Sequence, residues 1–218
     1  MSRALLAWTA LAAAAVFVLS WVGWEAAWPW LTSLDDAALD AAHRAGTAHP
    51  ARVTFWNVLC TVLSPLTFRV IVAGLVIWAA MRREWVSAVF LFVGVELVGA
   101  VTELFKFIAD RPRPATAMVH ASSTSFPSGH AFGTTAAVLI LLAFGLPMVR
   151  KGLQPWLIGA GVVAIVAVGV GRVALNVHHP SDVVAGWALG WVWFVGCLWL
   201  RGALLRGVER RAARDSSP

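Results

Sequence analysis

The stretch SFPSGHAFGTT, residues 125–135, joins a segment rich in Arg and Pro to a long apolar run. Pro127 suits the first position of a helix, which would place Ser128, Gly129 and His130 in the first turn. Free backbone N–H groups at such a turn, together with the helix dipole, favour an anion. The competing interpretation is an ordinary capped helix start that carries an incidental histidine.

The composition around this stretch indicates a membrane protein. Of the 218 residues, 60% are hydrophobic and only 13% are charged, whereas soluble domains are about half apolar and about a quarter charged. Several apolar runs are also long enough to cross a bilayer. We therefore expect an all-α, polytopic bundle of six transmembrane helices rather than a soluble helical domain.

The six expected spans lie at about residues 4–23, 65–81, 85–106, 130–148, 155–171 and 182–200. A cleaved signal peptide is the rival interpretation of the first run. That run is long for a signal peptide and no clean A-x-A site follows it, which favours an uncleaved span. Residues 1–218 are expected to form one domain, with its motifs in residues 106–182 and a basic cytoplasmic tail at 201–218.

A short amphipathic helix is expected on the membrane surface in the first outer loop, at residues 32–50. Thr32 or Ser33 can cap this helix, and Asp35 and Asp36 suit its first turn. This segment therefore predicts an interfacial helix rather than a seventh span.

Another helix near the interface is expected just before the second span. Ser64 and Pro65 resemble a cap followed by proline at the first helical position. Arg69 lies inside the span and is expected to snorkel outward. Arg82 and Arg83 then mark a tight turn into the third span.

The net charge is +6, but the basic residues fall between apolar runs and form no stripe, so no nucleic-acid partner is expected. Six spans put both termini on one side of the membrane. That side carries ten Lys and Arg against seven on the other, and its short turns are almost purely basic. The positive-inside rule places the termini in the cytoplasm and the loops at 107–129 and 172–182 outside. A bacterial-type cytoplasmic (inner) membrane is the expected location.

The outward loops hold three cations, Lys106, Arg113 and Arg172. Burying them together is unfavourable unless an anion lies among them. Arg suits bidentate contact with phosphate, and Lys supplies a compact charge. Taken singly, each of these cations is also explained as a snorkelling residue that flanks a span.

His178 and Asp182 lie four residues apart, so the carboxylate can reach back to the imidazole. Such contact fixes the tautomer and frees the other ring nitrogen as nucleophile or base, although a purely structural hydrogen bond is the alternative. His130 can then serve as the acid for the leaving oxygen. The cations and helix N–H groups would neutralise the phosphoryl oxygens, so neither a metal nor another cofactor is expected.

Together these residues resemble the three-part signature of the type 2 phosphatidic acid phosphatase superfamily: Lys106-x6-Arg113-Pro114, Pro127-Ser128-Gly129-His130, and Arg172-x5-His178-x3-Asp182. The resemblance implies a six-helix membrane bundle with a metal-independent, extracytoplasmic site. It also implies that His178 is the nucleophile that forms a phosphohistidine, that Asp182 orients it, and that His130 protonates the leaving group. The implied phosphate-binding residues are Lys106, Arg113, Ser128, Gly129 and Arg172. One departure is Gly171, where many members have Ser.

The expected activity is hydrolysis of a lipid phosphate or diphosphate at the outer leaflet. Undecaprenyl diphosphate, phosphatidylglycerol phosphate and phosphatidic acid are the candidate substrate types, and the sequence leaves the choice open. A lipid phosphotransferase using the same phosphohistidine is the alternative enzyme, and a lipid-headgroup transporter or scaffold is the alternative without catalysis. A soluble haloperoxidase, which shares the loop motifs, is disfavoured by six spans. The expected partners are the lipid phosphate and membrane lipids, with the oligomeric state open.

Two intramembrane acids, Glu96 and Glu103, lie on one face of the third span. Such acids are functional hypotheses by default. One interpretation is that Glu103 positions Lys106, and the other is helix packing. His179 is expected to have no catalytic role, and both cysteines are expected to be packing residues.

Overall fold

Helices make up all the regular structure of this computed structural model, which describes residues 2–215. In chain order they are α1 (Arg3–Glu25), α2 (Pro29–Ala48), α3 (Pro50–Val62), α4 (Pro65–Met81), α5 (Trp85–Leu91), the π-helical η1 (Phe92–Glu96), α6 (Val98–Ala109), α7 (Gly129–Gly145), the 3₁₀ turns η2 (Leu146–Met148) and η3 (Lys151–Leu153), α8 (Gln154–Ala174) and α9 (Pro180–Asp215). Within this part of the chain, six segments are long and apolar enough to cross a membrane: Arg3–Glu25, Pro50–Met81, Trp85–Ala109, Gly129–Met148, Lys151–Ala174 and Pro180–Ala213. The predicted all-α, six-span fold is confirmed.

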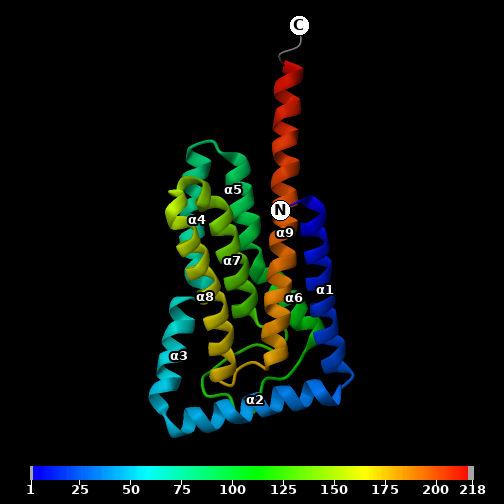
Figure 1. The fold of residues 1–218 in the computed structure, drawn as a ribbon, viewed down its shortest axis with the longest axis vertical. Helices are drawn as coiled ribbons and strands as arrows, with labels where there is room; N and C mark the ends of the chain where they lie inside the picture. Colours follow the sequence, from blue (N-terminus) through cyan, green and yellow to red (C-terminus); the bar gives the residue numbers. More distant parts are fainter. Residues whose placement is uncertain (1, 216–218) are drawn as a thin grey trace.

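Helices α7 and α9 run side by side through the bundle, with α1 packed along the other side of α9 (Figure 1). The contact between α7 and α9 is close because α9 presents glycines to it. A Cβ added at Gly186 would lie 2.8 Å from the Ser128 carbonyl oxygen, and one at Gly190 would lie 2.7 Å from the Thr135 Cβ. The GWALG segment at 186–190 is therefore a small-xxx-small contact.

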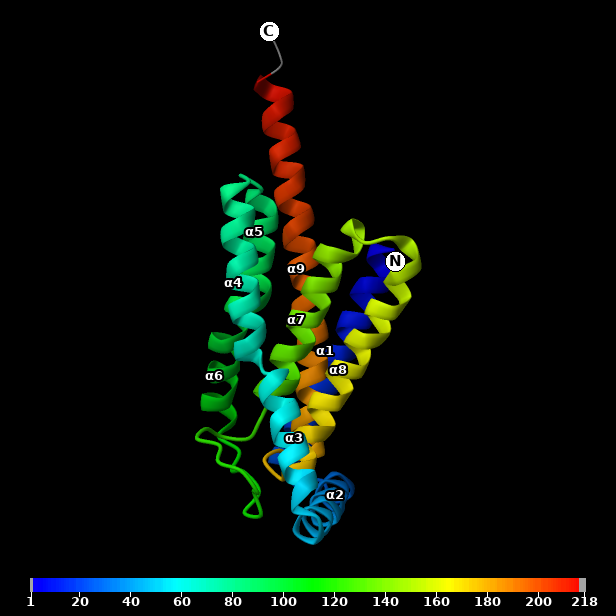
Figure 2. The same cartoon turned by 90° about the vertical axis from the view of Figure 1, so that its left-hand side faces the viewer.

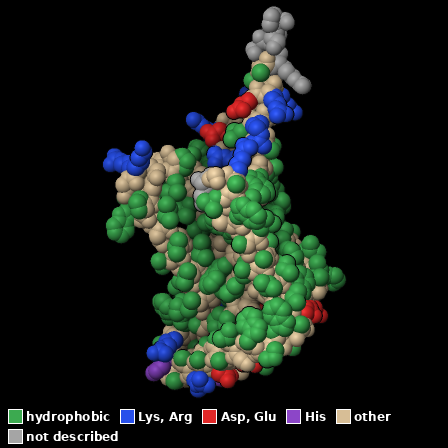
Figure 3. Space-filling view, turned by 45° about the vertical axis from the view of Figure 1, so that its right-hand side comes forward, with side chains coloured by type: hydrophobic (Ala, Val, Ile, Leu, Met, Phe, Trp, Pro, Cys, Tyr) green, Lys and Arg blue, Asp and Glu red, His purple; other side chains and the backbone are tan. Residues whose placement is uncertain are grey.

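The outer surface of the bundle is apolar, as a lipid-facing surface must be. Figure 3 shows hydrophobic side chains over the sides of the bundle, with Lys and Arg at its two ends and most of them near the end from which α9 projects. Large exposed side chains such as Trp8, Val163 and Phe107 are 70%, 67% and 84% exposed. These faces would be covered by lipid in a membrane.

Helix α2 lies across one end of the bundle, roughly at right angles to the other helices (Figure 1). The predicted interfacial helix is thus present, but the predicted caps were wrong. It begins at Pro29, because proline is pre-set for the first helical position. Thr32 lies inside the helix, where its hydroxyl donates to the Trp28 carbonyl at 2.9 Å. Asp35 therefore falls in the second turn, and it is buried.

The helix expected before the second span is present as α3. Helix α3 packs against α8 and continues toward α4, so that the two form one interrupted apolar segment (Figure 2). The break carries the predicted cap: the Ser64 hydroxyl accepts from the Thr67 N–H at 3.2 Å, and Pro65 opens α4.

Arg69 does not simply snorkel outward. Its Nε donates to the Glu96 Oε2 at 3.0 Å, which joins α4 to η1. Glu96 therefore has a partner across the helix interface. The turn from Phe92 to Glu96 is π-helical, a distortion that often occurs near functional sites.

The last two spans are longer than predicted. Helix α8 continues to Ala174, which places Arg172 in its last turn. Helix α9 continues to Asp215, so the basic tail extends the helix from residue 201 to residue 215. The remainder of the predicted tail, residues 216–218, lies outside the described residues.

Candidate active site

Four elements bring the predicted site residues together at the α2 end of the bundle. Lys106 lies in the last turn of α6 and Arg172 in that of α8, while α7 and α9 begin nearby. Between them lies a cavity of about 720 Å³, whose lining includes six of the eight predicted residues: Lys106, Arg113, Gly129, His130, Arg172 and His178. The other two, Ser128 and Asp182, are buried.

The three cations line this cavity with little opposing charge. Lys106 and Arg172 are only 6% and 7% exposed. Among residues 2–215, no ion pair joins Lys106, Arg113 or Arg172 to a carboxylate. Arg172 Nε also has no hydrogen-bond partner within that range. Buried guanidinium and ammonium groups of this kind fit a multiply charged anion such as a phosphoryl group.

Neutral groups orient two of the cations. Lys106 Nζ donates to the Ser123 hydroxyl at 2.5 Å. Arg113 donates to the carbonyl oxygens of Ser123 and Val177, so the loop after α6 is fixed to the loop before α9. Glu103 also lines the cavity, but no hydrogen bond or ion pair joins it to Lys106 in the described structure. The predicted positioning contact of Glu103 is therefore not formed.

Helix α7 starts two residues later than the sequence suggests. Its first residue is Gly129, and Ser128 is the N-cap, whose hydroxyl accepts from the Ala131 N–H at 3.5 Å. Pro127 precedes the cap rather than opening the helix, and its peptide bond with Phe126 is cis. The Ser128 hydroxyl thus faces the helix, whereas Gly129 faces the cavity. A Cβ added at Gly129 would lie 3.0 Å from the Thr102 Cγ2.

His178 is buried at the inner wall of the cavity and is 1% exposed. Its Nε2 lies 3.2 Å from Arg113 Nη1, and its Nδ1 lies 3.6 Å from Asp182 Oδ2. Burial lowers the pKa of His178 to about 3, although Asp182 acts in the opposite direction. The imidazole is therefore neutral at ordinary pH, which is the form that a nucleophile requires.

The Asp182 carboxylate has more partners than the sequence suggests. Its Oδ2 accepts from the Ser125 hydroxyl and from the His179 N–H at 2.8 Å. The ring Nδ1 of His179 lies 3.1 Å from the same oxygen, which is closer than the ring of His178. His179 was expected to have no catalytic role. In the structure it contacts the same Asp182 oxygen as His178, the expected nucleophile.

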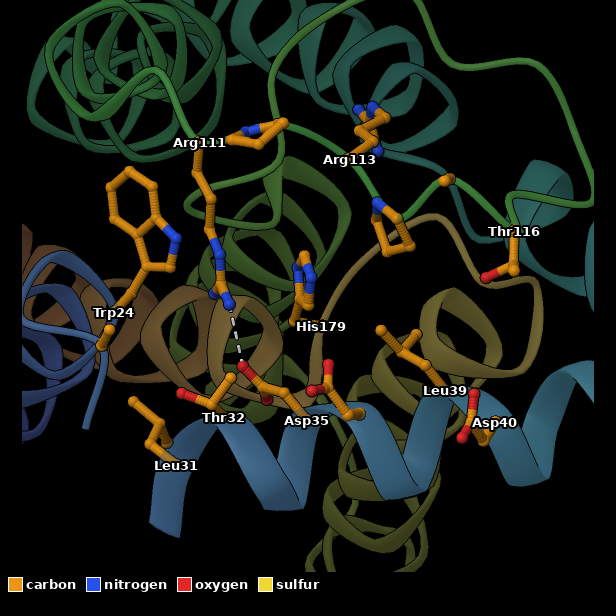
Figure 4. Close-up of a pocket in the computed structure, with 15 residues that line it drawn as sticks. Trp24, Leu31, Thr32, Asp35, Leu39, Asp40, Arg111, Arg113, Thr116 and His179 are labelled. Carbon is orange, nitrogen blue, oxygen red and sulfur yellow. Dashed lines mark hydrogen bonds and ion pairs between the residues drawn. The ribbon is translucent and has the colours of Figure 1, made fainter. Parts of the chain in front are cut away.

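Three contributors to the site were not predicted: Ser125, Arg111 and Asp35. Arg111 Nη1 donates to Asp182 Oδ1 at 2.6 Å, and its Nη2 donates to Asp35 Oδ2 at 2.9 Å. Figure 4 shows Arg111 reaching from the loop toward Asp35 on α2, with His179 beside it. These residues line a second cavity, of about 660 Å³, between α2 and the loop. The proximity of Arg111 to Arg113 in RPRP was the available signal.

The structure also explains why residue 171 is glycine. A Cβ at this position would lie 2.6 Å from the Cys60 Sγ and 3.0 Å from the Trp56 Cε3. Helix α3 therefore packs directly against the last turn of α8. Cys60 is a packing residue, as predicted, and it is placed beside the turn that carries Arg172.

A sequence comparison now identifies the family. The model of the PAP2 superfamily matches residues 87–206, more than half of the chain, and this match contains all three motifs. The chain belongs to the PAP2 superfamily. The resemblance to the type 2 phosphatidic acid phosphatases that the motifs suggested is thereby confirmed.

Relatives within the PAP2 superfamily include several bacterial and archaeal phosphatases. The chain is 37% identical over 115 residues to a decaprenylphosphoryl-5-phosphoribose phosphatase of Mycobacterium tuberculosis, a match that covers 50% of this chain and 56% of the relative. It is 36% identical over 118 residues to phosphatidylglycerophosphatase B of Bacillus subtilis, covering 52% and 57%. An undecaprenyl-diphosphatase of Sulfolobus acidocaldarius is 32% identical over 134 residues, covering 57% and 59%. These matches thus span between half and two thirds of the relatives.

The fold extends the similarity beyond these aligned segments. The crystal structure of a transmembrane PAP2-type phosphatidylglycerolphosphate phosphatase from Bacillus subtilis matches with a TM-score of 0.76 and 24% identity. The match covers 91% of this chain and 97% of that one. The two proteins therefore share the arrangement of helices across nearly their whole length.

Proposed function

We propose that this protein is a membrane phosphatase that hydrolyses a lipid phosphate or diphosphate without a metal, through a phosphohistidine on His178. The observation that carries the proposal is the convergence of Lys106, Arg113 and Arg172 on the buried, neutral His178 in one cavity. The relatives support it, because their names describe phosphatases that act on lipid-linked phosphates. PAP2 membership supports it as well.

In the proposed reaction, His178 Nε2 attacks the phosphorus atom while the bond from phosphorus to the leaving oxygen breaks. His130, which lines the same cavity, donates a proton to that oxygen. Asp182 lies on the Nδ1 side of His178 and would keep Nε2 free for the attack. The oxygen of a water molecule then attacks the phosphorus atom while the bond from phosphorus to His178 Nε2 breaks. His130 takes a proton from that water, and inorganic phosphate leaves.

The cations stabilise this reaction in place of a metal. Charge builds on the equatorial phosphoryl oxygens in the transition state, and preorganised donors stabilise that charge best. Lys106, Arg113 and Arg172 supply positive charge, while the start of α7 at Gly129 offers backbone N–H groups. We include Ser128 as the residue that fixes this helix start, since its hydroxyl caps α7.

The shape of the cavity favours a substrate that remains in the membrane. Its walls continue along α4 at Leu66 and along α6 at Gly99, inside segments that are apolar enough to span a bilayer. A headgroup could bind beside His178 while its lipid tail stays between these helices. We place the site at the outer leaflet, because the basic turns at Arg82–Arg83 and Arg150–Lys151 lie at the opposite end of the bundle (Figure 1).

The proposal is tested with purified protein in EDTA and a panel of lipid monophosphates and diphosphates. Release of inorganic phosphate is the expected result, and His178→Ala is expected to abolish it because no nucleophile remains. His49→Ala, on an exposed residue that lines neither cavity, is the matched control and should keep full activity. Complete loss of wild-type activity on chelation would contradict the metal-free mechanism. Transfer of phosphate to a lipid alcohol without its release would instead establish a phosphotransferase.

A further inference from the structure

A buried chain of ionic contacts connects the surface helix α2 to the site. Arg111 Nη1 donates to the Asp182 Oδ1 at 2.6 Å and Nη2 donates to the Asp35 Oδ2 at 2.9 Å. The side chains of these three residues are 5%, 0% and 2% exposed. One guanidinium therefore bridges two carboxylates that are 147 positions apart in the sequence (182 − 35).

The chain is anchored on α2 by further hydrogen bonds. Asp35 Oδ1 accepts from the Ser181 N–H at 2.9 Å, and its Oδ2 accepts from the Ser181 hydroxyl. Ser181 also accepts from Arg111 Nη1 at 2.7 Å. The guanidinium of Arg111 lies 5.4 Å from the centre of the Trp24 ring, which covers its outer side. Asp35 thus holds both Arg111 and the first turn of α9.

Arg111 is separated from the phosphate-binding cations by its position. Lys106 and Arg172 line the cavity that contains His178, whereas Arg111 lines the second cavity against α2 (Figure 4). Arg113 lies between the two cavities and lines both of them. Its bridging role also requires the planar fork of arginine, since a lysine ammonium cannot make two such directed contacts in opposite directions. Burying charged groups carries a substantial desolvation penalty. The buried contacts of Arg111 with Asp35 and Asp182 therefore suggest a specific role for this arginine.

We infer that Arg111, anchored by Asp35, is a positioning residue that fixes the Asp182 carboxylate for its contact with His178. Arg111 occupies Oδ1, so only Oδ2 remains for the histidine side, where Ser125 and His179 also bind. The positive charge of Arg111 also offsets part of the negative charge that Asp182 presents to His178. The inference rests on the proposed function, in which Asp182 orients the nucleophile.

Each helix or loop that packs around His178 contributes charged or titratable groups. They are Lys106 and Glu103 on α6, Arg113 and His120 in the loop, His130 on α7, Arg172 on α8, His179 before α9, and Asp182 on α9. The cations Arg113 and Arg172 oppose protonation of His178, whereas the carboxylate of Asp182 favours it. Removing the charge of Arg111 would strengthen the effect of Asp182, so the pKa of His178 should rise from its value of about 3.

The test compares variants that separate charge from geometry. Arg111→Lys keeps the charge but loses the fork, whereas Arg111→Gln loses both. Asp35→Asn keeps the charge of Arg111 but weakens its anchor. All three should lower kcat, by about 100-fold for Arg111→Gln, because small misplacements of catalytic groups have effects of that order. KM and inhibition by vanadate should change little, since Arg111 does not line the phosphate cavity.

The pH dependence distinguishes positioning from general structural damage. The acidic limb of the kcat/KM profile, and the ring titration of ¹⁵N-labelled His178 by NMR, should move to higher pH in Arg111→Gln only. Asp36→Asn changes an exposed carboxylate on the same helix and should leave both readouts as in the wild type. Combining Asp35→Asn with Arg111→Gln should be no worse than Arg111→Gln alone, because the two residues act through one contact.

Wild-type kcat and an unchanged His178 titration in folded Arg111→Gln would overturn the inference. So would a loss confined to KM and vanadate affinity, which would make Arg111 a phosphate ligand. If Arg111→Gln does not fold, Asp35→Asn and Arg111→Lys decide through their kcat values. A wild-type protein that released no phosphate from any lipid would refute the proposed function, while the NMR titration would still test the link from Arg111 to His178.

Discussion

At two positions near His178, the close packing of the site depends on individual atoms. Gly171 is one of them, because a Cβ there would lie 2.6 Å from the Cys60 Sγ, which leaves no space for a serine side chain. Asp182 is the other, because its two oxygens serve Arg111, Ser125 and two histidines at once. Both positions show that a residue in a motif, or next to one, can depend on contacts with residues far away in the sequence.

Gly171→Ser is therefore expected to destabilise the protein by about 1–3 kcal/mol, the usual range for overpacking a filled contact. Thermal unfolding in detergent measures the change. Adding Cys60→Ala should recover most of the loss, since it removes the atom that the serine meets. Gly159→Ser is the control, because nothing lies within 4 Å of a Cβ at that position. Equal effects of the two serine substitutions would show that the Cys60 contact is unimportant.

At the scale of helices, the predicted spans correspond to the observed ones because hydrophobic periodicity and length are local properties of the sequence. The errors occurred where a partner decides the outcome. Asp35 was expected in the first turn of its helix, but it lies in the second turn and is buried against Arg111. The three motifs correctly predicted the cavity, whereas Ser125 and Arg111 were missed since their contacts join segments 57 and 71 positions apart.

The contact between α7 and α9 gives a prediction at this scale. Gly186 lies one turn after Asp182, and a Cβ there would be 2.8 Å from the Ser128 carbonyl oxygen, a backbone atom that cannot move aside cheaply. Gly186→Ala should push the start of α9 away from the start of α7 and lower kcat by about 100-fold. Gly196→Ala, on the same helix with nothing within 4 Å, should keep normal turnover. Phosphate release is measured for both variants. Full activity of Gly186→Ala would show that turnover does not depend on the close contact between the starts of α7 and α9.

The whole molecule has two distinct ends. Helix α2 and the loop after α6 lie at one end, while the turn between α4 and α5 and the projecting part of α9 lie at the other (Figures 1 and 2). The cavity that contains His178 is lined by residues of that loop and of the adjoining helix ends. This polarity supports the proposed topology, in which the site faces outward and the basic end faces the cytoplasm.

Cysteine labelling tests that topology. Ala117→Cys places a thiol on the exposed loop near the site, and Arg83→Cys places one in the turn at the other end. A membrane-impermeant maleimide added to intact cells should label the first, and it should label the second only after lysis. The native Cys60 and Cys197 are buried and give little background. The reverse pattern would show that the site faces the cytoplasm.

The length of α9 has a consequence for the end of the molecule that lies opposite the site. Its 36 residues measure about 54 Å at a rise of about 1.5 Å per residue, and the hydrocarbon layer takes up about 30 Å of that length. One end of α9 therefore extends as a continuous helix beyond the bilayer. Arg206, Arg210 and Arg211 lie on this projecting part of α9, and they extend the positive field of the protein beyond the bilayer surface into the aqueous phase.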